Sequence, residues 1–286
     1  MNTETMPDIS KIIDLDKYPI DDLDNPITQK LIKDCRARLD YDGCALIKDL
    51  VKQESLDRMQ AEADRLYDQT YWSKGTHTPY FNKDDPSLPE GHPKRSFQER
   101  SSGYINSDIL ETKSDLRAIY ASNTVTQFIS KCLGVTPLHT WEDPLACNPY
   151  SIMDSENYFP WHFDGNEFTV SILVQESEAG GVFEYAADLR NPENENFEGV
   201  KEILEGGREG VNQLDLRPGD MQIFKGRFSM HRVTKITGNR RRVIALPTYV
   251  TDSYSVNRPA HSIHLYGRAE SIHYERENYR VDGLTD

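Results

Sequence analysis

The sequence has little of what membrane, secreted and nucleic-acid-binding proteins require. No apolar run approaches the roughly 20 residues of a membrane-spanning helix. Residues 1–25 are acidic and lack the basic-then-apolar order of a secretory signal peptide. Positive charge is scarce, with 33 Lys and Arg against 47 Asp and Glu and a formal net charge of −14. Because phosphate backbones are bound by basic surfaces, we expect no nucleic-acid partner, and we expect a cytoplasmic protein that does not bind membranes.

Cysteine is also scarce. The four cysteines at positions 35, 44, 132 and 147 form no CxxC pair and have no zinc-ligand spacing. A reduced cytoplasm is the simplest interpretation, so we expect these residues to act as small, unpaired members of the core.

The rest of the composition supports a sizeable core. The 286 residues include 10 Phe, 15 Tyr and 3 Trp, and a mainly β chain of this length often forms one domain. Apolar spacing predicts helices over residues 26–40, 53–69 and 107–133, with a long polar loop over residues 71–106. From residue 138, short β runs alternate with turns, and one helix is inserted within residues 194–210.

This order predicts a mainly β fold with N-terminal helices, namely a double-stranded β-helix or cupin-like jelly roll. We expect a single domain over residues 1–286. Its parts are a helical layer and substrate loop over 1–137, the β core over 138–250, and a tail over 251–286 that could fold back as a lid.

Two candidate metal ligands stand at the mouth of the apolar run WHFDGNEFTVSILVQ, residues 161–175. His162 and Asp164 are two positions apart, so in a strand both side chains project from the same face. His231 follows much later, in the segment GRFSMHRV. Two histidines and one carboxylate match the facial triad that holds non-haem Fe(II) and leaves the opposite face of the metal open. The pair alone would equally fit a half-exposed strand end, so the later histidine carries the hypothesis.

Three arginines at positions 240–242 lead into the apolar run VIAL. Alternation places Arg240 and Arg242 on one face of the strand and Arg241 on the other, with Arg242 deepest. An unpaired buried charge is costly, so a guanidinium there needs an anion. A dicarboxylate co-substrate would supply one through two parallel hydrogen bonds. The alternative is that all three arginines are solvated.

Together these segments resemble the Fe(II)/2-oxoglutarate-dependent oxygenases, whose motifs are His-x-Asp, a distal His and an Arg shortly after it. The segments EDPLACNPY, WHFDGNEFTVSILVQESEAGGVFEY, NFEGVKEILEGG and LRPGDMQIFKGRFSMHRVTKITGNRRRVIAL are most similar to one bacterial branch. That branch contains free-amino-acid hydroxylases and carrier-independent amino-acid halogenases, and the resemblance covers roughly residues 138–250. It implies a double-stranded β-helix, metal binding by His162, Asp164 and His231, and binding of the distal carboxylate of 2-oxoglutarate by Arg242.

The resemblance also implies a reaction. Fe(II), 2-oxoglutarate and O₂ are the expected cofactors, and the expected reaction hydroxylates an aliphatic C–H of a small free amino acid or derivative, releasing succinate and CO₂. Halogenating relatives carry a small residue, commonly Gly, at the position of Asp164. Here Gly165 comes one residue later, so halogenation is disfavoured. Desaturation and cyclisation with the same cofactors stay open as alternatives.

Two other classes of protein are alternatives. A jelly roll that binds a metal or ligand without oxygenase activity keeps the two histidines and the aspartate but has no need for Arg242. A zinc hydrolase is disfavoured because no general base with motif support is present.

Further residues are candidates for binding co-substrate or substrate. Strand alternation suggests three side chains for 2-oxoglutarate: Asn148, Tyr150 and Thr169. Candidates for the substrate are Trp161 as a wall, Glu142 or Asp143 for an ammonium group, and Arg95 or Arg100 for a carboxylate. Packing, turn capping or solvation are the alternatives for each. The histidines at 139, 261, 264 and 273 have no partner at ligand spacing and are expected to be structural or on the surface. The expected partner is an amino-acid-like small molecule, and the oligomeric state is open, with a homodimer among the options.

Overall fold

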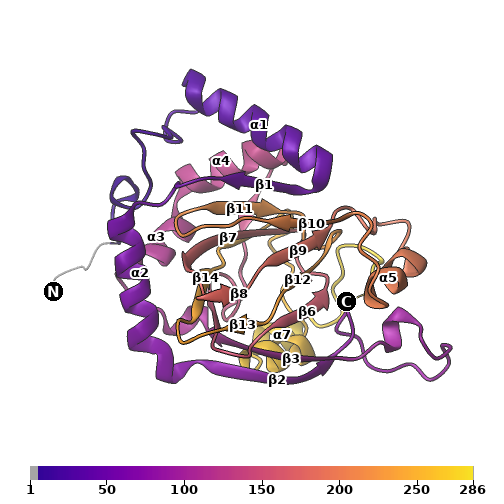
Figure 1. Cartoon of the computed structure of the whole chain (residues 1–286). Helices are drawn as coiled ribbons and strands as arrows, with labels where there is room; N and C mark the ends of the chain where they lie inside the picture. Colours follow the sequence, from indigo (N-terminus) through magenta and orange to yellow (C-terminus); the bar gives the residue numbers. More distant parts are fainter. Residues whose placement is uncertain (1–5, 286) are drawn as a thin grey trace.

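The strands form two main sheets that enclose a cavity, and helices cover the outer side of the larger sheet (Figure 1). The computed structural model describes residues 6–285. The strands are β1 (Cys44–Ile47), β2 (Tyr71–His77), β3 (Gln98–Ile105), β4 (His139–Thr140), β5 (Tyr150–Met153), β6 (Phe159–His162), β7 (Phe168–Gln175), β8 (Ala179–Gly180), β9 (Phe183–Ala186), β10 (Val211–Leu214), β11 (Met221–Phe224), β12 (Met230–Val233), β13 (Ile236–Thr237), β14 (Arg242–Ala245) and β15 (Thr248–Val250).

The larger sheet has nine strands, with the order β1-β11-β7-β14-β5-β3-β2 and with β15 joining β7 to β4. The smaller sheet has four strands in the order β10-β9-β12-β6, and β8 pairs with β13 apart from both. The pairs between these strands are antiparallel. This arrangement confirms the mainly β jelly roll that the sequence predicts.

The helices before the β core pack on the outer face of the larger sheet, where they share one hydrophobic cluster with β5, β7, β11 and β14. Their ends follow local sequence rules, since Asn25 caps the first helix and Gly43 ends it with φ 68°. The helices are α1 (Pro26–Asp42), α2 (Gln53–Leu66), α3 (Asp115–Ala121), α4 (Asn123–Leu133), α5 (Phe197–Leu204), α6 (Pro259–Tyr266) and α7 (Ser271–Glu275), with 3₁₀ turns at Ile9–Lys11, Tyr67–Gln69, Pro93–Arg95 and Ser107–Ile109.

Strand alternation separates the two faces of the larger sheet. On β14, Val243 and Ala245 pack against the helices, whereas Arg242 and Ile244 face the cavity between the sheets. The same split holds on the three strands nearest to it, where the cavity-facing side chains include several polar ones: Ser151 on β5, Thr169 and Ser171 on β7, and Gln222 on β11. Polar residues inside apolar strands therefore mark the inner face.

The structure corrects two predictions for the N-terminal half. Residues 71–106, predicted as a loop, contain β2 and β3, which pair from Tyr71↔Tyr104 to His77↔Gln98. The sequence does not indicate a strand at β2 because β2 is an edge strand with most of its side chains exposed, so it lacks an apolar run. The helix predicted from residue 107 begins only at Asp115 and breaks at Ser122, which caps both α3 and α4.

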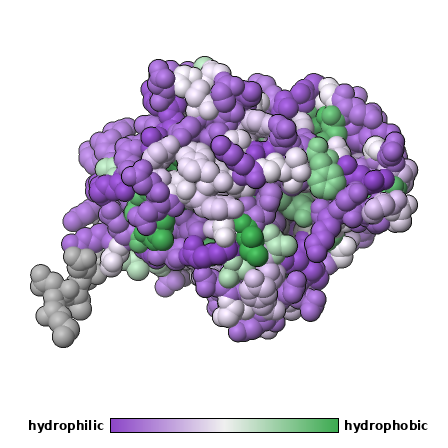
Figure 2. All heavy atoms as spheres, turned by 90° about the horizontal axis from the view of Figure 1, so that it is seen from below, coloured by the Kyte–Doolittle hydropathy of each residue, from purple (hydrophilic) through white to green (hydrophobic). Residues whose placement is uncertain are grey.

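No helix among residues 6–285 is long and apolar enough to cross a membrane. The face seen from below β2 is largely hydrophilic, with hydrophobic residues in small separate groups (Figure 2). All four cysteines are free, and three of them are buried, as predicted.

Candidate metal centre

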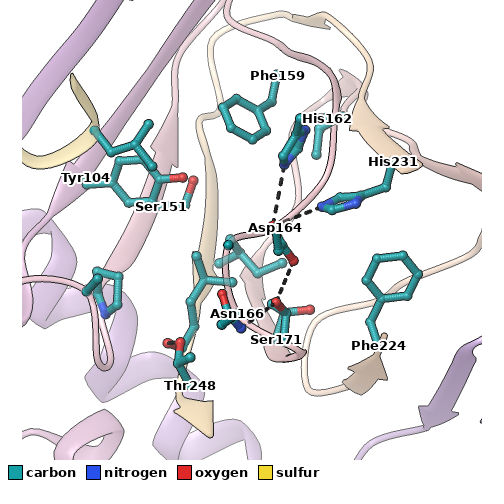
Figure 3. A pocket seen from close by; sticks show the side chains of 18 of the residues that line it. Tyr104, Ser151, Phe159, His162, Asp164, Asn166, Ser171, Phe224, His231 and Thr248 are labelled. Atoms are coloured by element: carbon teal, nitrogen blue, oxygen red, sulfur yellow. Dashed lines mark hydrogen bonds and ion pairs between the residues drawn. The ribbon is translucent and has the colours of Figure 1, made fainter. Parts of the chain in front are cut away.

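The two predicted metal-binding segments meet because β6 and β12 are neighbours. His162 at the end of β6 and His231 in β12 stand directly opposite each other in the antiparallel register. Asp164 follows two residues after His162, where the chain leaves the strand. Figure 3 shows the three side chains converging on one point of the cavity.

The distances suit a divalent metal ion. His162 Nε2 lies 3.7 Å and His231 Nε2 lies 3.3 Å from Asp164 Oδ1, and one ligand atom from each residue lies within 4.8 Å of the others. Metal–nitrogen and metal–oxygen bonds of about 2.1 Å at right angles would place neighbouring ligand atoms about 3 Å apart. Among residues 6–285, this is the group of His, Cys, Asp and Glu side chains with such a geometry.

Backbone carbonyls fix the tautomer of both histidines. The Nδ1 atom of His162 lies 2.8 Å from the Pro160 carbonyl oxygen, and that of His231 lies 3.0 Å from the Ser229 carbonyl oxygen. A carbonyl only accepts, so each Nδ1 carries the proton and each Nε2 presents a lone pair to the centre. Burial, followed by the neighbouring His231, lowers the pKa of His162 well below its usual value, which keeps this ligand neutral.

Asp164 is held on three sides. Its N–H donates to the Gly226 carbonyl oxygen at 3.1 Å, and Thr169 Oγ1 donates to its Oδ2 at 2.6 Å, leaving Oδ1 for the metal. A Cβ added at Gly226 would lie 1.9 Å from Asp164 Oδ2, so only glycine leaves room for this carboxylate. Burial alone would raise the pKa of Asp164, but His231 and the Thr169 hydrogen bond outweigh it and lower the pKa, so the carboxylate is ionised.

Arg242 lines the same cavity and is 5% exposed. Within the described residues its guanidinium has neither a hydrogen bond nor a carboxylate partner, and burial lowers the pKa of Arg242 to about 10. Its neighbours in sequence are paired outside the cavity: Arg240 lies 3.7 Å from Glu176, and Arg241 stacks on Tyr67 at 3.7 Å. The alternative of three solvated charges therefore fails for Arg242, which is positioned to receive an anion inside the cavity.

Two co-substrate candidates lie elsewhere. The Tyr150 hydroxyl donates to Glu62 of α2 at 2.8 Å, on the helix side of the larger sheet. Asn148 is buried, but it does not line the cavity. The residues of β5 that face inward are Ser151 and Met153 instead. Thr169 does line the cavity, where it supports Asp164.

Most of the substrate candidates prove structural. Trp161 is buried in a separate hydrophobic cluster and does not line the cavity, and the Arg232 guanidinium lies 4.8 Å from its ring centre. Glu142 lies 3.4 Å from Arg276 and Arg95 lies 2.9 Å from Asp84, both away from the cavity. Asp143 is fully buried and accepts hydrogen bonds from the Leu145, Ala146 and Asn257 N–H groups, with His273 3.0 Å away. Its turn-capping alternative is therefore correct.

Arg100 on β3 is different from these. It is 2% exposed, its side chain donates to Ser102 Oγ, and its Nη1 has no partner among the described residues. The guanidinium lies 4.2 Å from the ring centre of Phe159 and 5.5 Å from that of Tyr104, and both rings line the cavity. Burial lowers the pKa of Arg100 to about 10.

Part of the cavity wall comes from outside residues 138–250, and the sequence did not indicate it. Phe81 and Tyr104 come from the segment predicted as a loop, and His261, Leu265 and Tyr266 come from α6. His261 was expected to be structural or on the surface because it lacks a partner at ligand spacing, but it lines the cavity. The wall is assembled from segments distant in sequence, and no local pattern in either segment indicates it.

The sequence matches the family model described as Halogenase D over residues 27–263. The chain belongs to the Halogenase D family. No curated protein matches the sequence at a significant level. Among solved structures, the epimerase SnoN, described in complex with Fe³⁺, α-ketoglutarate and nogalamycin RO, is 13% identical with a TM-score of 0.55, covering 81% of this chain and 88% of that one. An oxidoreductase of the 2OG-Fe(II) oxygenase family from Burkholderia pseudomallei is 14% identical with a TM-score of 0.50, covering 78% and 92%.

At these identities the two structures show a shared fold. Together with membership of the Halogenase D family, that fold confirms the predicted superfamily, and the protein is an enzyme of the 2-oxoglutarate-dependent oxygenase class. In this member of the family, Asp164 places a carboxylate in the cluster, at the position where the sequence resemblance implies a small residue in halogenating relatives, so the family name alone does not fix the reaction.

Proposed function

We propose that the protein is an Fe(II)- and 2-oxoglutarate-dependent hydroxylase of a small free amino acid or a close derivative. The observation that carries the proposal is one cavity that contains both the His162, Asp164 and His231 cluster and the unpaired guanidinium of Arg242. A jelly roll that binds only a metal or a neutral ligand would have no reason to bury such a charge, because an unpaired buried ion costs stability.

Each residue of the cavity has a defined task. His162, Asp164 and His231 would hold Fe(II), and Arg242 would bind the distal carboxylate of 2-oxoglutarate through two parallel hydrogen bonds. When bound, iron, 2-oxoglutarate and O₂ supply the oxidation of an aliphatic C–H bond, with release of succinate and CO₂. The apolar rings of Phe159, Phe183 and Phe224 border the same cavity and exclude water from it.

Hydroxylation is favoured over halogenation by the way Asp164 is seated. A halide ligand would need the metal position that this carboxylate takes. Thr169 and the absent side chain of Gly226 shape the surroundings of Asp164 for a carboxylate. The pocket around this position is therefore built to hold an acid rather than a vacancy.

The substrate carboxylate is assigned to Arg100. Its buried Nη1 lacks an acceptor, and although Arg100 does not itself line the cavity, its charge lies directly behind two rings that do, Phe159 and Tyr104. Apart from Asp164, no carboxylate is among the residues that line the cavity within the described part of the chain. An ammonium group would therefore meet neutral oxygen acceptors, for which Asn166 and Thr248 are available. Cytoplasmic location and oligomeric state stay predictions.

The test is a screen of free amino acids for succinate release with Fe(II), 2-oxoglutarate and excess chloride, with the product mass measured in parallel. The expected product carries one added oxygen atom and no chlorine. Loss of two hydrogen atoms would indicate desaturation or cyclisation. A chlorinated product from the unmodified protein, or turnover only with a carrier-tethered amino acid, would contradict the proposal.

The variant Asp164→Gly extends the screen. It opens one metal position while leaving both histidines, so hydroxylation should fall sharply. Chlorination is not expected from this change alone because the halide also needs a shaped pocket. Gly165→Ala is a matched control for a change of volume beside the site, because a Cβ at Gly165 comes only within 3.9 Å of Asn257.

A further inference from the structure

Two arginines lie directly behind the strand that carries the metal ligands. Arg190 and Arg227 are each 1% exposed. Along residues 162–165, the side chains of His162 and Asp164 point to the metal centre. The two residues that alternate with them are Phe163 and Gly165, and each contacts one of these arginines.

The contacts are close and directional. Arg227 Nη1 donates to the Gly165 carbonyl oxygen at 2.9 Å, one peptide unit from Asp164. The Arg190 guanidinium lies 4.0 Å from the ring centre of Phe163, which stands between His162 and Asp164 in the sequence. Arg190 Nε also donates to the Arg227 carbonyl oxygen at 2.7 Å, which links the two arginines.

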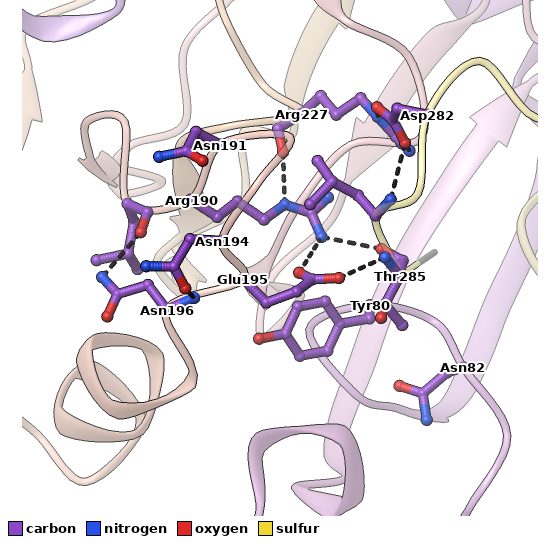
Figure 4. Close-up of polar contacts among 12 residues, drawn as sticks. Tyr80, Asn82, Arg190, Asn191, Asn194, Glu195, Asn196, Arg227, Asp282 and Thr285 are labelled. Atoms are coloured by element: carbon purple, nitrogen blue, oxygen red, sulfur yellow. Dashed lines mark hydrogen bonds and ion pairs between the residues drawn. The ribbon is translucent and has the colours of Figure 1, made fainter.

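Both arginines are anchored by the end of the chain (Figure 4). Asp282 accepts two hydrogen bonds from Arg227, at 2.6 Å to Nε and 2.5 Å to Nη2. The Thr285 carbonyl oxygen accepts from Arg190 Nη1 at 2.9 Å, and Glu195 accepts from the same nitrogen at 3.0 Å. Residues 282–285 thus orient both guanidinium groups behind the metal centre, and Asp282 neutralises that of Arg227, whereas Glu195 neutralises that of Arg190.

We propose that the C-terminal segment 282–285 is a working part of the metal centre, with Asp282 and Arg227 as positioning residues for Asp164. The inference rests on the proposed function, because it requires a metal at the triad. Arg227 fixes the carbonyl that follows Asp164, and Asp282 fixes Arg227 in a bidentate geometry that a single carboxylate can hold rigidly.

The expected size of the effect follows from how outer contacts act on metal sites. Groups that orient a metal ligand typically change metal affinity by about 10- to 100-fold when they are removed. Without Asp282, the buried Arg227 would turn toward another acceptor and release Gly165. The Asp164 carboxylate would then occupy its position for a smaller fraction of the time, although none of the three ligands has been changed.

The test uses Co(II) as the probe, added to the full-length apoprotein without oxygen, and compares dissociation constants below the unfolding temperature of each variant. We expect Asp282→Ala to weaken Co(II) binding by about 10- to 100-fold, and Asp282→Glu to recover part of the loss. Glu277→Gln removes a charge shortly before this segment, from a side chain without a contact to Arg227, so the Co(II) affinity of this variant should equal that of the wild type.

The outcomes separate the two proposals. Equal Co(II) affinity in wild type and Asp282→Ala, even with a lower unfolding temperature, would overturn this inference alone and leave the tail with a purely structural role. A wild type that binds no stoichiometric Co(II) would overturn this inference and the proposed function together. If Asp282→Ala does not fold, the isosteric Asp282→Asn gives the same comparison with the same outcomes.

Discussion

The buried arginines of this protein fall into two pairs with opposite surroundings. Arg190 and Arg227 each have a carboxylate partner, Glu195 and Asp282 respectively. Arg100 and Arg242 are as deeply buried, but neither has a carboxylate partner within the described residues. The paired arginines lie behind the metal-ligand strand, whereas the unpaired ones lie at or beside the cavity.

The difference between the two pairs indicates where an anionic ligand would bind. A buried charge that the protein neutralises itself stabilises the fold around it, and its removal shows in unfolding. A buried charge left without a partner costs stability, so its benefit must come from an anion that arrives later. The two groups should therefore respond to substitution in different measurements, and four predictions test this.

The largest effect is expected from breaking a paired arginine. Glu195→Ala leaves the Arg190 guanidinium buried beside Phe163 without its carboxylate, which should lower the free energy of unfolding by about 3–5 kcal/mol. Denaturant unfolding measures this loss. The control Asp34→Ala removes the partner of Lys30 in an exposed pair and should change stability by less than about 1 kcal/mol. Equal losses of unfolding free energy in both variants would show that the buried Arg190–Glu195 pair stabilises the fold no more than an exposed pair does.

Arg242→Ala should weaken the binding of 2-oxoglutarate instead of lowering the stability of the fold. Loss of a bidentate charge-assisted contact costs about 2–5 kcal/mol, so the 2-oxoglutarate concentration for half-maximal succinate release should rise by roughly 30-fold to several thousand-fold. The matched control is Arg241→Ala, whose side chain stacks on Tyr67 outside the cavity and should matter much less. If Arg240→Ala were the damaging change, the assignment along this strand would be wrong.

Arg100→Ala should weaken the binding of the amino-acid substrate alone. Hydrogen bonds to charged groups contribute about 1.5–3 kcal/mol, so KM for the amino acid should rise by roughly 10- to 150-fold while the 2-oxoglutarate requirement stays unchanged. Arg95→Ala is the control, because Arg95 is paired with Asp84. An Arg100→Ala enzyme with unchanged KM would show that this guanidinium serves packing against Phe159.

The smallest effect concerns pH. Burial, opposed by a hydrogen bond to Thr78 and aided by the charge of Arg100, lowers the pKa of His77 to about 3. In the unfolded chain it titrates near its usual value, about 6.5, so between pH 4 and 6 only the unfolded state binds this proton. Stability from neutral His77 is therefore complete above about pH 6.5 and is lost as pH falls.

His77→Gln should flatten the dependence of unfolding free energy on pH by about 1.4 kcal/mol per pH unit between pH 4 and 6. The variant His139→Gln, at a half-exposed histidine, controls for the replacement of one histidine by glutamine. Parallel profiles for His77→Gln and the wild type would mean that the unpaired charge of Arg100 and the burial of His77 leave its protonation unaffected.

Part of this site follows from sequence because local rules determine it. The same-face spacing of His162 and Asp164 and the entry of Arg242 into an apolar strand need only strand alternation. Sequence could not give the inward face of β5, so Tyr150 was placed on the wrong side and Ser151 was missed. The edge strand β2 lacks an apolar run, and its pairing with β3 was also missed.

Local sequence rules cannot predict contacts between segments that are distant in the chain. The contact of Asp282 with Arg227, and through it with Gly165, joins segments far apart in the chain, and each residue alone looks like an ordinary charge or turn. Likewise, Glu142 and Asp143 lie near a strand that approaches the site, but their partners, Arg276 and His273, come from the C-terminal tail.

The most direct test of the account is an anaerobic titration of wild-type protein with 2-oxoglutarate, with and without Fe(II), repeated on His231→Ala. Because the metal and Arg242 are proposed to bind opposite ends of one dicarboxylate, Fe(II) should tighten 2-oxoglutarate binding in the wild type and have little effect in His231→Ala. An affinity for 2-oxoglutarate that is the same with and without Fe(II) in the wild type would contradict the account.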